Sequence, residues 1–159
     1  MPSRLSLVPV IALLAVSMAE QGATKEEVLS PRELNSHADS YHDQNVIVKG
    51  YVTLYPNGHS LYQSRELSLE FVRRLRSGDP AFDPTEYQEY CLTIANPGFM
   101  LDHQHEWNGK TIIAKGRFIK NYLAGYIDMG ACPLPTAIVI DEADLKRRYS
   151  EMFRKKREH

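Results

Sequence analysis

The sequence predicts a single mainly β domain, a small closed barrel with flanking helices, and three observations carry that prediction. Residues 46–52 and 112–118 alternate apolar and polar side chains, and each carries a Lys-Gly step in the middle of the strand. Shorter strand-like runs at 60–64, 87–95 and 137–140 bring the predicted strands to five. With 159 residues, the chain is large enough for one domain with a substantial core.

The first nineteen residues have the pattern of a secretory signal. Arg4 supplies a positive charge, residues 5–16 are almost wholly apolar, and Ser17 and Ala19 are small residues placed for cleavage. We expect residues 1–19 to be a signal peptide, with a retained N-terminal anchor as the alternative. Residues 20–27 are mostly polar, and we expect residues 20–29 to be a flexible lead. A periplasmic or secreted protein follows, with no transmembrane segment in the mature chain.

The two cysteines, Cys91 and Cys132, fit an exported protein. In an oxidising compartment two lone cysteines usually pair, so we expect a disulfide between them. Two separate buried thiols are the alternative.

The charge is unevenly distributed along the chain, although its formal net value is only −1. Residues 146–159 have seven Lys or Arg against two Glu, whereas residues 20–145 have eleven basic and eighteen acidic residues. The acidic body makes nucleic acid an unexpected partner. The basic tail suggests peripheral contact with an anionic surface, and a solvated helix with charges that follow its dipole is the alternative.

The domain is predicted to span residues 30–141 and to begin with a short helix. Ser30, Pro31 and Glu33 form a capping box for a helix over 31–40. The first strand, 45–55, is expected to bury its even-numbered positions and to expose 47, 49, 51 and 53. A turn at 56–59 joins it to the second strand at 60–64.

A helix is predicted as an insertion between the second and third strands. Leu67, Phe71 and Leu75 recur every fourth residue over 65–77, and Gly78 ends the helix. The third strand follows at 87–95, and one helical turn is expected within 99–107.

The fourth strand is predicted at 110–120, followed by a turn at 121–124. The fifth begins at 125–129, is interrupted by Pro133 and Pro135, and resumes at 137–140. Residues 142–159 form a basic C-terminal helix with acidic residues in its first turn.

The pattern around the first strand resembles a known family. Leu34, Tyr41, a polar pair and the run from Val46 to Val52 resemble small exported bacterial OB-fold proteins, which are similar to the tRNA-anticodon-binding-like barrels. The resemblance implies a five-stranded Greek-key barrel over roughly residues 30–141. Gly50 and Gly116 would then mark bends or close approaches in the barrel wall.

The resemblance also implies a place for a ligand, across the second and third strands between the loops 56–59 and 121–124. The side chains expected there, which combine aromatic rings with basic groups, are Tyr51, Tyr62, Lys115, Arg117 and Tyr122. Such side chains stack on sugars or bases and contact phosphates. The alternative is that tyrosines simply favour strands and lysines protect strand edges.

The sequence carries no convincing catalytic or metal-binding set. His103 and His105, with Asp102 or Glu106, are a weak candidate, since structural zinc needs four ligands and no HExxH motif occurs. We therefore expect no catalytic residue, no metal and no cofactor. The predicted function is an exported, non-enzymatic OB-fold module that binds an oligosaccharide or an envelope protein. The alternative is a metal-dependent hydrolase or nuclease on the same barrel, which would use Asp128, Asp141, Glu142 and Arg117.

Overall fold

The computed structural model describes residues 26–55, 58–125 and 132–154. The predicted signal peptide, residues 20–25 of the lead and residues 126–129 of the predicted fifth strand lie outside these ranges.

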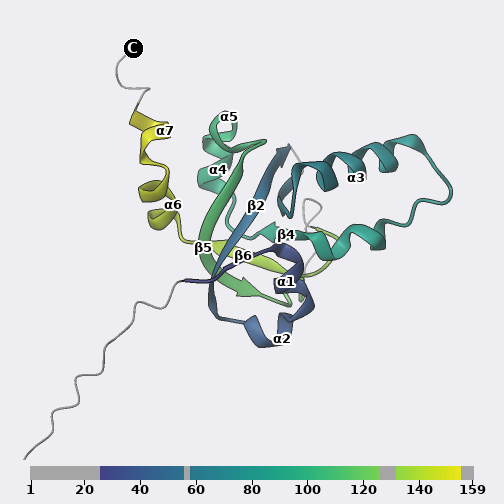
Figure 1. Cartoon of the computed structure of the whole chain (residues 1–159), viewed down its shortest axis with the longest axis horizontal. Coiled ribbons are helices and arrows are strands. Elements are labelled where there is room, and N and C mark those ends of the chain that lie inside the picture. Colours follow the sequence, from purple (N-terminus) through teal and green to yellow (C-terminus); the bar gives the residue numbers. More distant parts are fainter. Residues whose placement is uncertain (1–25, 56–57, 126–131, 155–159) are drawn as a thin grey trace, which may run out of the picture.

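Five strands close into a barrel, as the sequence predicts (Figure 1). The strands are β2 (Asn45–Tyr55), β3 (Gly58–Tyr62), β4 (Cys91–Ile94), β5 (Thr111–Ile119) and β6 (Ala137–Ile140). Their neighbour order is β2-β3-β4-β6-β5, and β2 also pairs with β5, which closes the barrel. Only β4 and β6 run parallel to each other within the barrel. This arrangement confirms the OB-like Greek-key fold.

A sixth strand corrects the prediction for the lead. β1 (Val28–Leu29) pairs in parallel with β2, with Val28 opposite Ile47 and Leu29 opposite Val48. Leu29 is only 6% exposed and belongs to the core. The expected flexible lead over 20–29 is therefore wrong at its last two residues, because they add to the sheet.

The two glycines lie in adjacent strands, as expected, and close approach explains both of them. β2 and β5 are antiparallel neighbours in which Gly50 faces Ile112 and Gly116 faces Val46. A Cβ atom on Gly50 would lie 2.5 Å from Cγ of Leu61, and one on Gly116 would lie 2.4 Å from the carbonyl oxygen of Val139. No side chain fits at either position unless a neighbouring strand moves.

The predicted alternation of β2 is confirmed on its inner face and corrected on its outer face. The inward residues Val48, Val52 and Leu54 are fully buried. Ile47 and Thr53, which were expected to be solvated, are only 7% and 4% exposed. Ile47 lies beside Val28 of β1, which pairs with β2 in the sheet. Thr53 lies opposite Ser60 of β3, close to the disulfide described below. Neighbouring segments therefore bury both side chains.

Two of the predicted helices are each divided in two. The first consists of α1 (Pro31–Ser36), which has the predicted capping box, and α2 (Ala38–Tyr41). The C-terminal helix consists of α6 (Glu142–Arg148) and α7 (Ser150–Arg154), with Tyr149 between them. Between β4 and β5, α4 (Gly98–Asp102) and α5 (Gln104–Trp107) cover one end of the barrel, where Met100 and Trp107 enter the core.

The open edge of β5 is covered by the C-terminal helices. The strand pairs with β6 only from Gly116 onward. Before that point the N–H of Ile113 donates to the hydroxyl of Tyr149 at 2.7 Å, and the N–H of Asp141 donates to the carbonyl of Lys115 at 2.8 Å. These two bonds satisfy the backbone where no strand does.

The insertion between β3 and β4 forms an arm that projects from the barrel (Figure 1). α3 (Arg65–Ser77) has the predicted bounds and ends at Gly78, whose φ of 65° is left-handed. A 3₁₀ helix, η1 (Pro84–Tyr90), replaces the predicted first half of the third strand, because Tyr87 packs against Phe71 of α3. Leu75 was expected on the buried stripe but is 57% exposed, since the helix extends beyond the barrel.

The fit at Gly116 gives a first prediction. Gly116→Ala should lower the free energy of unfolding by about 1–3 kcal/mol, because the added methyl group meets a backbone carbonyl that cannot rotate away. Thermal unfolding should show a fall in Tm of roughly 3–10 °C. Gly98→Ala is the matched control, since nothing lies within 4 Å of its added Cβ. Equal melting temperatures for the two variants would contradict the close approach.

Candidate functional site

The predicted ligand face is a packed cluster at its centre rather than an open surface. Tyr51 and Tyr62 are opposite each other across β2 and β3, and Cys91 follows as the partner of Tyr62 on β4. Tyr62 is only 8% exposed, and its ring centroid lies 6.3 Å from that of Phe71 in α3. The expectation that Tyr62 lines an accessible binding face is wrong in this respect.

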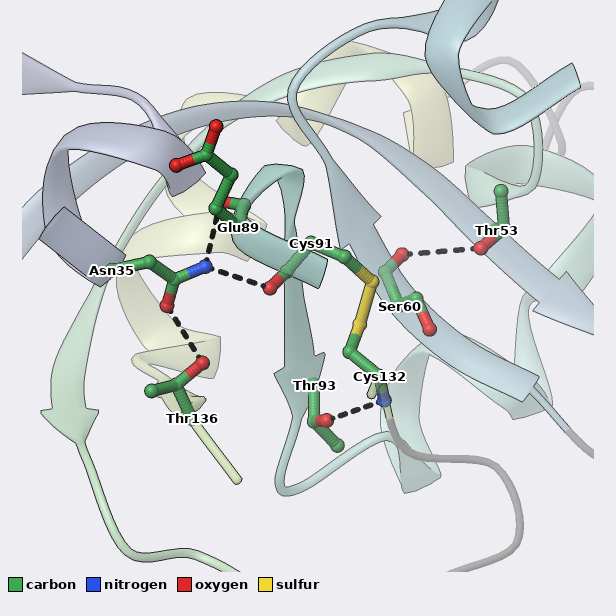
Figure 2. Close-up of a disulfide and its surroundings, with 8 residues drawn as sticks. All are labelled: Asn35, Thr53, Ser60, Glu89, Cys91, Thr93, Cys132 and Thr136. Atoms are coloured by element: carbon green, nitrogen blue, oxygen red, sulfur yellow. Dashed lines mark hydrogen bonds between the residues drawn. A yellow bond between two sulfur atoms is a disulfide. The ribbon is translucent and has the colours of Figure 1, made fainter. Parts of the chain in front are cut away.

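The predicted disulfide between Cys91 and Cys132 is confirmed (Figure 2). It holds the chain around Cys132 against the outer face of β4. It links residues 41 apart in the sequence, with Cα atoms 5.9 Å from each other. The N–H of Cys132 donates to the hydroxyl of Thr93 at 2.9 Å. Cys91 is fully buried and Cys132 is 4% exposed. The segment that carries Cys132 therefore lies on the outer face of β4.

Asn35 of α1 also binds the chain segments around the disulfide (Figure 2). Its side-chain amide donates to the carbonyls of Glu89 at 2.8 Å and Cys91 at 3.1 Å, and its oxygen accepts from the hydroxyl of Thr136 at 2.7 Å. One asparagine thus joins η1, β4 and the segment before β6. The face on which OB folds usually bind ligands is closed by segments of this chain.

The basic residues of the predicted site lie on a different part of the barrel. Lys115 and Arg117 are on β5, opposite Ile47 and Asn45 of β2. Arg117 forms an ion pair of 2.8 Å with Asp43, and Lys115 lies 3.8 Å from Glu26. β2 pairs with β5 through its first half and with β3 through its second half, so the outward residues of the two halves belong to different surfaces.

Tyr122 is placed by the turn after β5. Its N–H donates to the carbonyl of Pro135 at 2.8 Å, and its side chain is half-buried. The five predicted residues therefore do not form one patch, because Tyr51 and Tyr62 lie on the β2–β3 surface whereas Lys115 and Arg117 lie on β5.

A hollow of about 260 Å³ lies beside Lys115, between β1, α2 and the start of β2. Its polar lining consists of Lys115, the carboxylates of Glu26 and Glu27, the phenol of Tyr41, and the amides of Gln44 and Asn45. Its apolar lining consists of Leu29, Val46 and Ile47. We refer to it below as the Lys115 hollow. Sequence reasoning found Lys115 but missed Glu26 and the contribution of Tyr41, since both depend on where β1 and α2 pack.

A network of charges extends from this hollow to α6. The carboxylate of Asp144 is only 3% exposed and accepts from both Arg147 and Arg148. Burial by itself would raise the pKa of Asp144, but the hydrogen bond and charge of Arg148, followed by the charges of Arg147 and Lys115, outweigh burial and lower it. Arg148 has a raised pKa, chiefly because it donates to Asp144.

Contacts of this kind also involve the three bases of α6. Lys146 lies 3.6 Å from Glu142 and 4.0 Å from the centre of the Phe99 ring, while Arg147 and Arg148 are bound to Asp144. The three bases of α6 therefore interact with neighbours in the fold. Residues 155–159, which carry three more bases, lie outside the described ranges.

The residues considered for a nuclease site have structural roles where they are described. Asp141 caps α6 by accepting from the N–H of Asp144 at 3.0 Å, and Glu142 pairs with Lys146. Asp128 lies outside the described residues. His103 packs edge-on against the rings of both Phe99 and Phe153, at centroid distances of 5.0 and 5.3 Å.

The described parts of the chain contain neither a cluster of metal ligands nor a helix that could span a membrane. Within residues 26–55, 58–125 and 132–154, no three His, Cys, Asp or Glu side chains are grouped so that they could hold a metal ion. Over the same ranges, every helix is too short or too polar to cross a bilayer.

The disulfide can be tested directly. The unfolded, unreduced protein should expose no reactive thiol, and replacing both cysteines by alanine should lower the free energy of unfolding by about 4 kcal/mol, because the bridge restricts the unfolded chain. Thiol titration in denaturant and urea unfolding measure the two effects. Reductant should destabilise the natural protein but not the double variant. Two reactive thiols in the unreduced protein would contradict the bridge.

The buried carboxylate predicts a pH dependence. Asp144→Asn should lower the free energy of unfolding at neutral pH, because Asp144 has a lower pKa when folded than its ordinary 3.8. The contribution of such a group is present above the unfolded pKa and is lost as the pH falls through the folded pKa. Urea unfolding from about pH 7 to 2 should therefore show the natural protein and the variant converging below about pH 4. Glu142→Gln, which alters an exposed pair, should change stability by less than about 1 kcal/mol at every pH.

Comparison with known proteins adds no relative to this description. The resemblance to exported OB-fold proteins stays a prediction based on the pattern around β2, while the fold itself is established by the strand order. No family model matches the chain, and neither the curated proteins nor the solved structures include a match to it.

Proposed function

We propose that this protein is an exported, non-enzymatic binding module whose ligand occupies the Lys115 hollow. One observation carries the proposal: a residue predicted as ligand-binding from the sequence, Lys115, lines a hollow of about 260 Å³ on the outside of the barrel. The usual OB face is closed by the disulfide-linked segment and by α3, which leaves this hollow as the better candidate.

The lining of the hollow suits a polyhydroxylated ligand such as an oligosaccharide. Carboxylates and amide oxygens accept hydrogen bonds from hydroxyl groups, amide N–H groups and ammonium donate to them, and an aromatic ring packs against the face of a sugar. Glu26, Asn45, Lys115 and Tyr41 provide one of each kind. The distance of 3.8 Å between Lys115 and Glu26 exceeds a hydrogen bond, so a hydroxyl group can bond to both.

Export is part of the same proposal. It is supported by the signal-like pattern of residues 1–19 and by the disulfide, a bond typical of proteins outside the cytosol. A periplasmic or secreted module that recognises an oligosaccharide, or an envelope protein that carries one, agrees with both features.

Screening the purified exported protein on an oligosaccharide array tests the ligand class. Binding should occur, and Lys115→Gln and Tyr41→Ala should each weaken it about tenfold, because each removes a direct contact. Lys49→Gln is the matched control, since Lys49 is an exposed lysine of the neighbouring strand that does not line the hollow. The proposal fails if no oligosaccharide binds, or if the three variants bind equally well. Capture of one envelope protein that is insensitive to Lys115→Gln would place the contact elsewhere.

A further inference from the structure

A second hollow lies between α4 and the C-terminal helices and shares no residue with the Lys115 hollow. It has a volume of about 290 Å³ and is lined by Phe99, Lys146, Ser150 and Phe153. The rings of Phe99 and Phe153 are 5.9 Å apart between centroids. Both contact Trp107, whose side chain is fully buried behind them, at centroid distances of 6.1 and 5.7 Å.

The polar part of this second hollow consists of hydrogen-bond donors next to the aromatic rings. Nζ of Lys146 lies 4.0 Å from the centre of the Phe99 ring, and Ser150, the first residue of α7, lines the same hollow. The acidic partner of Lys146, Glu142, is 3.6 Å away and does not line the hollow. A ligand carboxylate entering here would meet a cation and a hydroxyl, and none of the described residues that line the hollow is a carboxylate.

We propose that the second hollow binds a small organic monocarboxylate with an apolar body. The apolar part would lie against Phe99 and Phe153, and the carboxylate would bind Lys146 and Ser150. A volume of about 290 Å³ has room for roughly ten non-hydrogen atoms, because one water molecule occupies about 30 Å³ in the liquid. Such a ligand is the size of a short fatty acid or a phenyl-substituted acid. Its dissociation constant should be on the order of 1 mM.

Trp107 makes this inference testable without a label, because it is the single tryptophan of the chain. Its indole Nε1 has no hydrogen-bond partner among the described residues, so its emission should respond when a ligand changes its surroundings. Titration of the purified protein with hexanoate should give a saturable change in tryptophan emission. Hexanamide, which has the same number of non-hydrogen atoms and no charge, should bind about tenfold more weakly.

Three variants assign the response to the second hollow. Lys146→Met keeps an unbranched side chain over Phe99 but removes the charge, and should weaken hexanoate binding about tenfold. Ser150→Phe places a ring at an exposed position on the rim, and should abolish binding while the Tm stays within a few degrees of the natural value. Lys115→Gln should leave hexanoate binding unchanged, which separates this site from the oligosaccharide site.

The inference is overturned if hexanoate gives no saturable change, or if hexanamide binds equally well. It is also overturned if Ser150→Phe retains the response while folded, as judged by circular dichroism. Loss of hexanoate binding in Lys115→Gln would show that the acid binds in the Lys115 hollow instead.

Discussion

Closure of the barrel depends on the antiparallel pairing of β2 with β5, which runs from Asn45 opposite Arg117 to Tyr51 opposite Thr111. Both strands are long enough to pair with a second neighbour, β3 in one case and β6 in the other. At Gly50 and Gly116 the neighbouring chain comes so close that a side chain would collide with it. The other elements are arranged around this pair: β1, β3 and β6 pair with one of the two strands, β4 joins β3 to β6, and the helices cover the ends and outer faces.

The attached elements turn much of the outer wall of the barrel into a second layer. α3 places Phe71 against Tyr62 of β3, Tyr87 of η1 packs against Phe71, and the disulfide holds Cys132 over β4. β1 extends the sheet beside Ile47 and Val48 of β2. Apolar and hydroxyl side chains that would be solvated in a bare barrel are buried as a result. The Lys115 hollow lies where β1 and α2 meet the barrel, and the second hollow lies between α4 and the C-terminal helices.

The sequence was sufficient to predict the barrel strands but not which of their outward residues are exposed. Alternation located β2 and β5, a capping box located α1, and apolar spacing with Gly78 at its end located α3, because these signals act over a few residues. β1 is two residues long and has no local signature, so pairing with β2 alone defines it. Tyr62 was assigned to the correct side of its strand. An alternating pattern does not predict whether that side faces solvent or is covered by other segments of the chain. Its cover comes from Phe71 of α3 and from Cys132, which tertiary packing brings against it. Lys115 was found for its place on β5, whereas Glu26 and Tyr41 join it only through tertiary packing.

Tyr149, which separates α6 from α7, also affects how exposed the edge of β5 is to other molecules. An uncovered strand edge offers its N–H and C=O groups to any extended segment, including the same strand of another molecule. Here the phenol occupies the N–H of Ile113, and the start of α6 occupies the carbonyl of Lys115. A single aromatic side chain and one backbone amide therefore protect the protein against edge-to-edge aggregation, a task that a further strand performs in many other sheets.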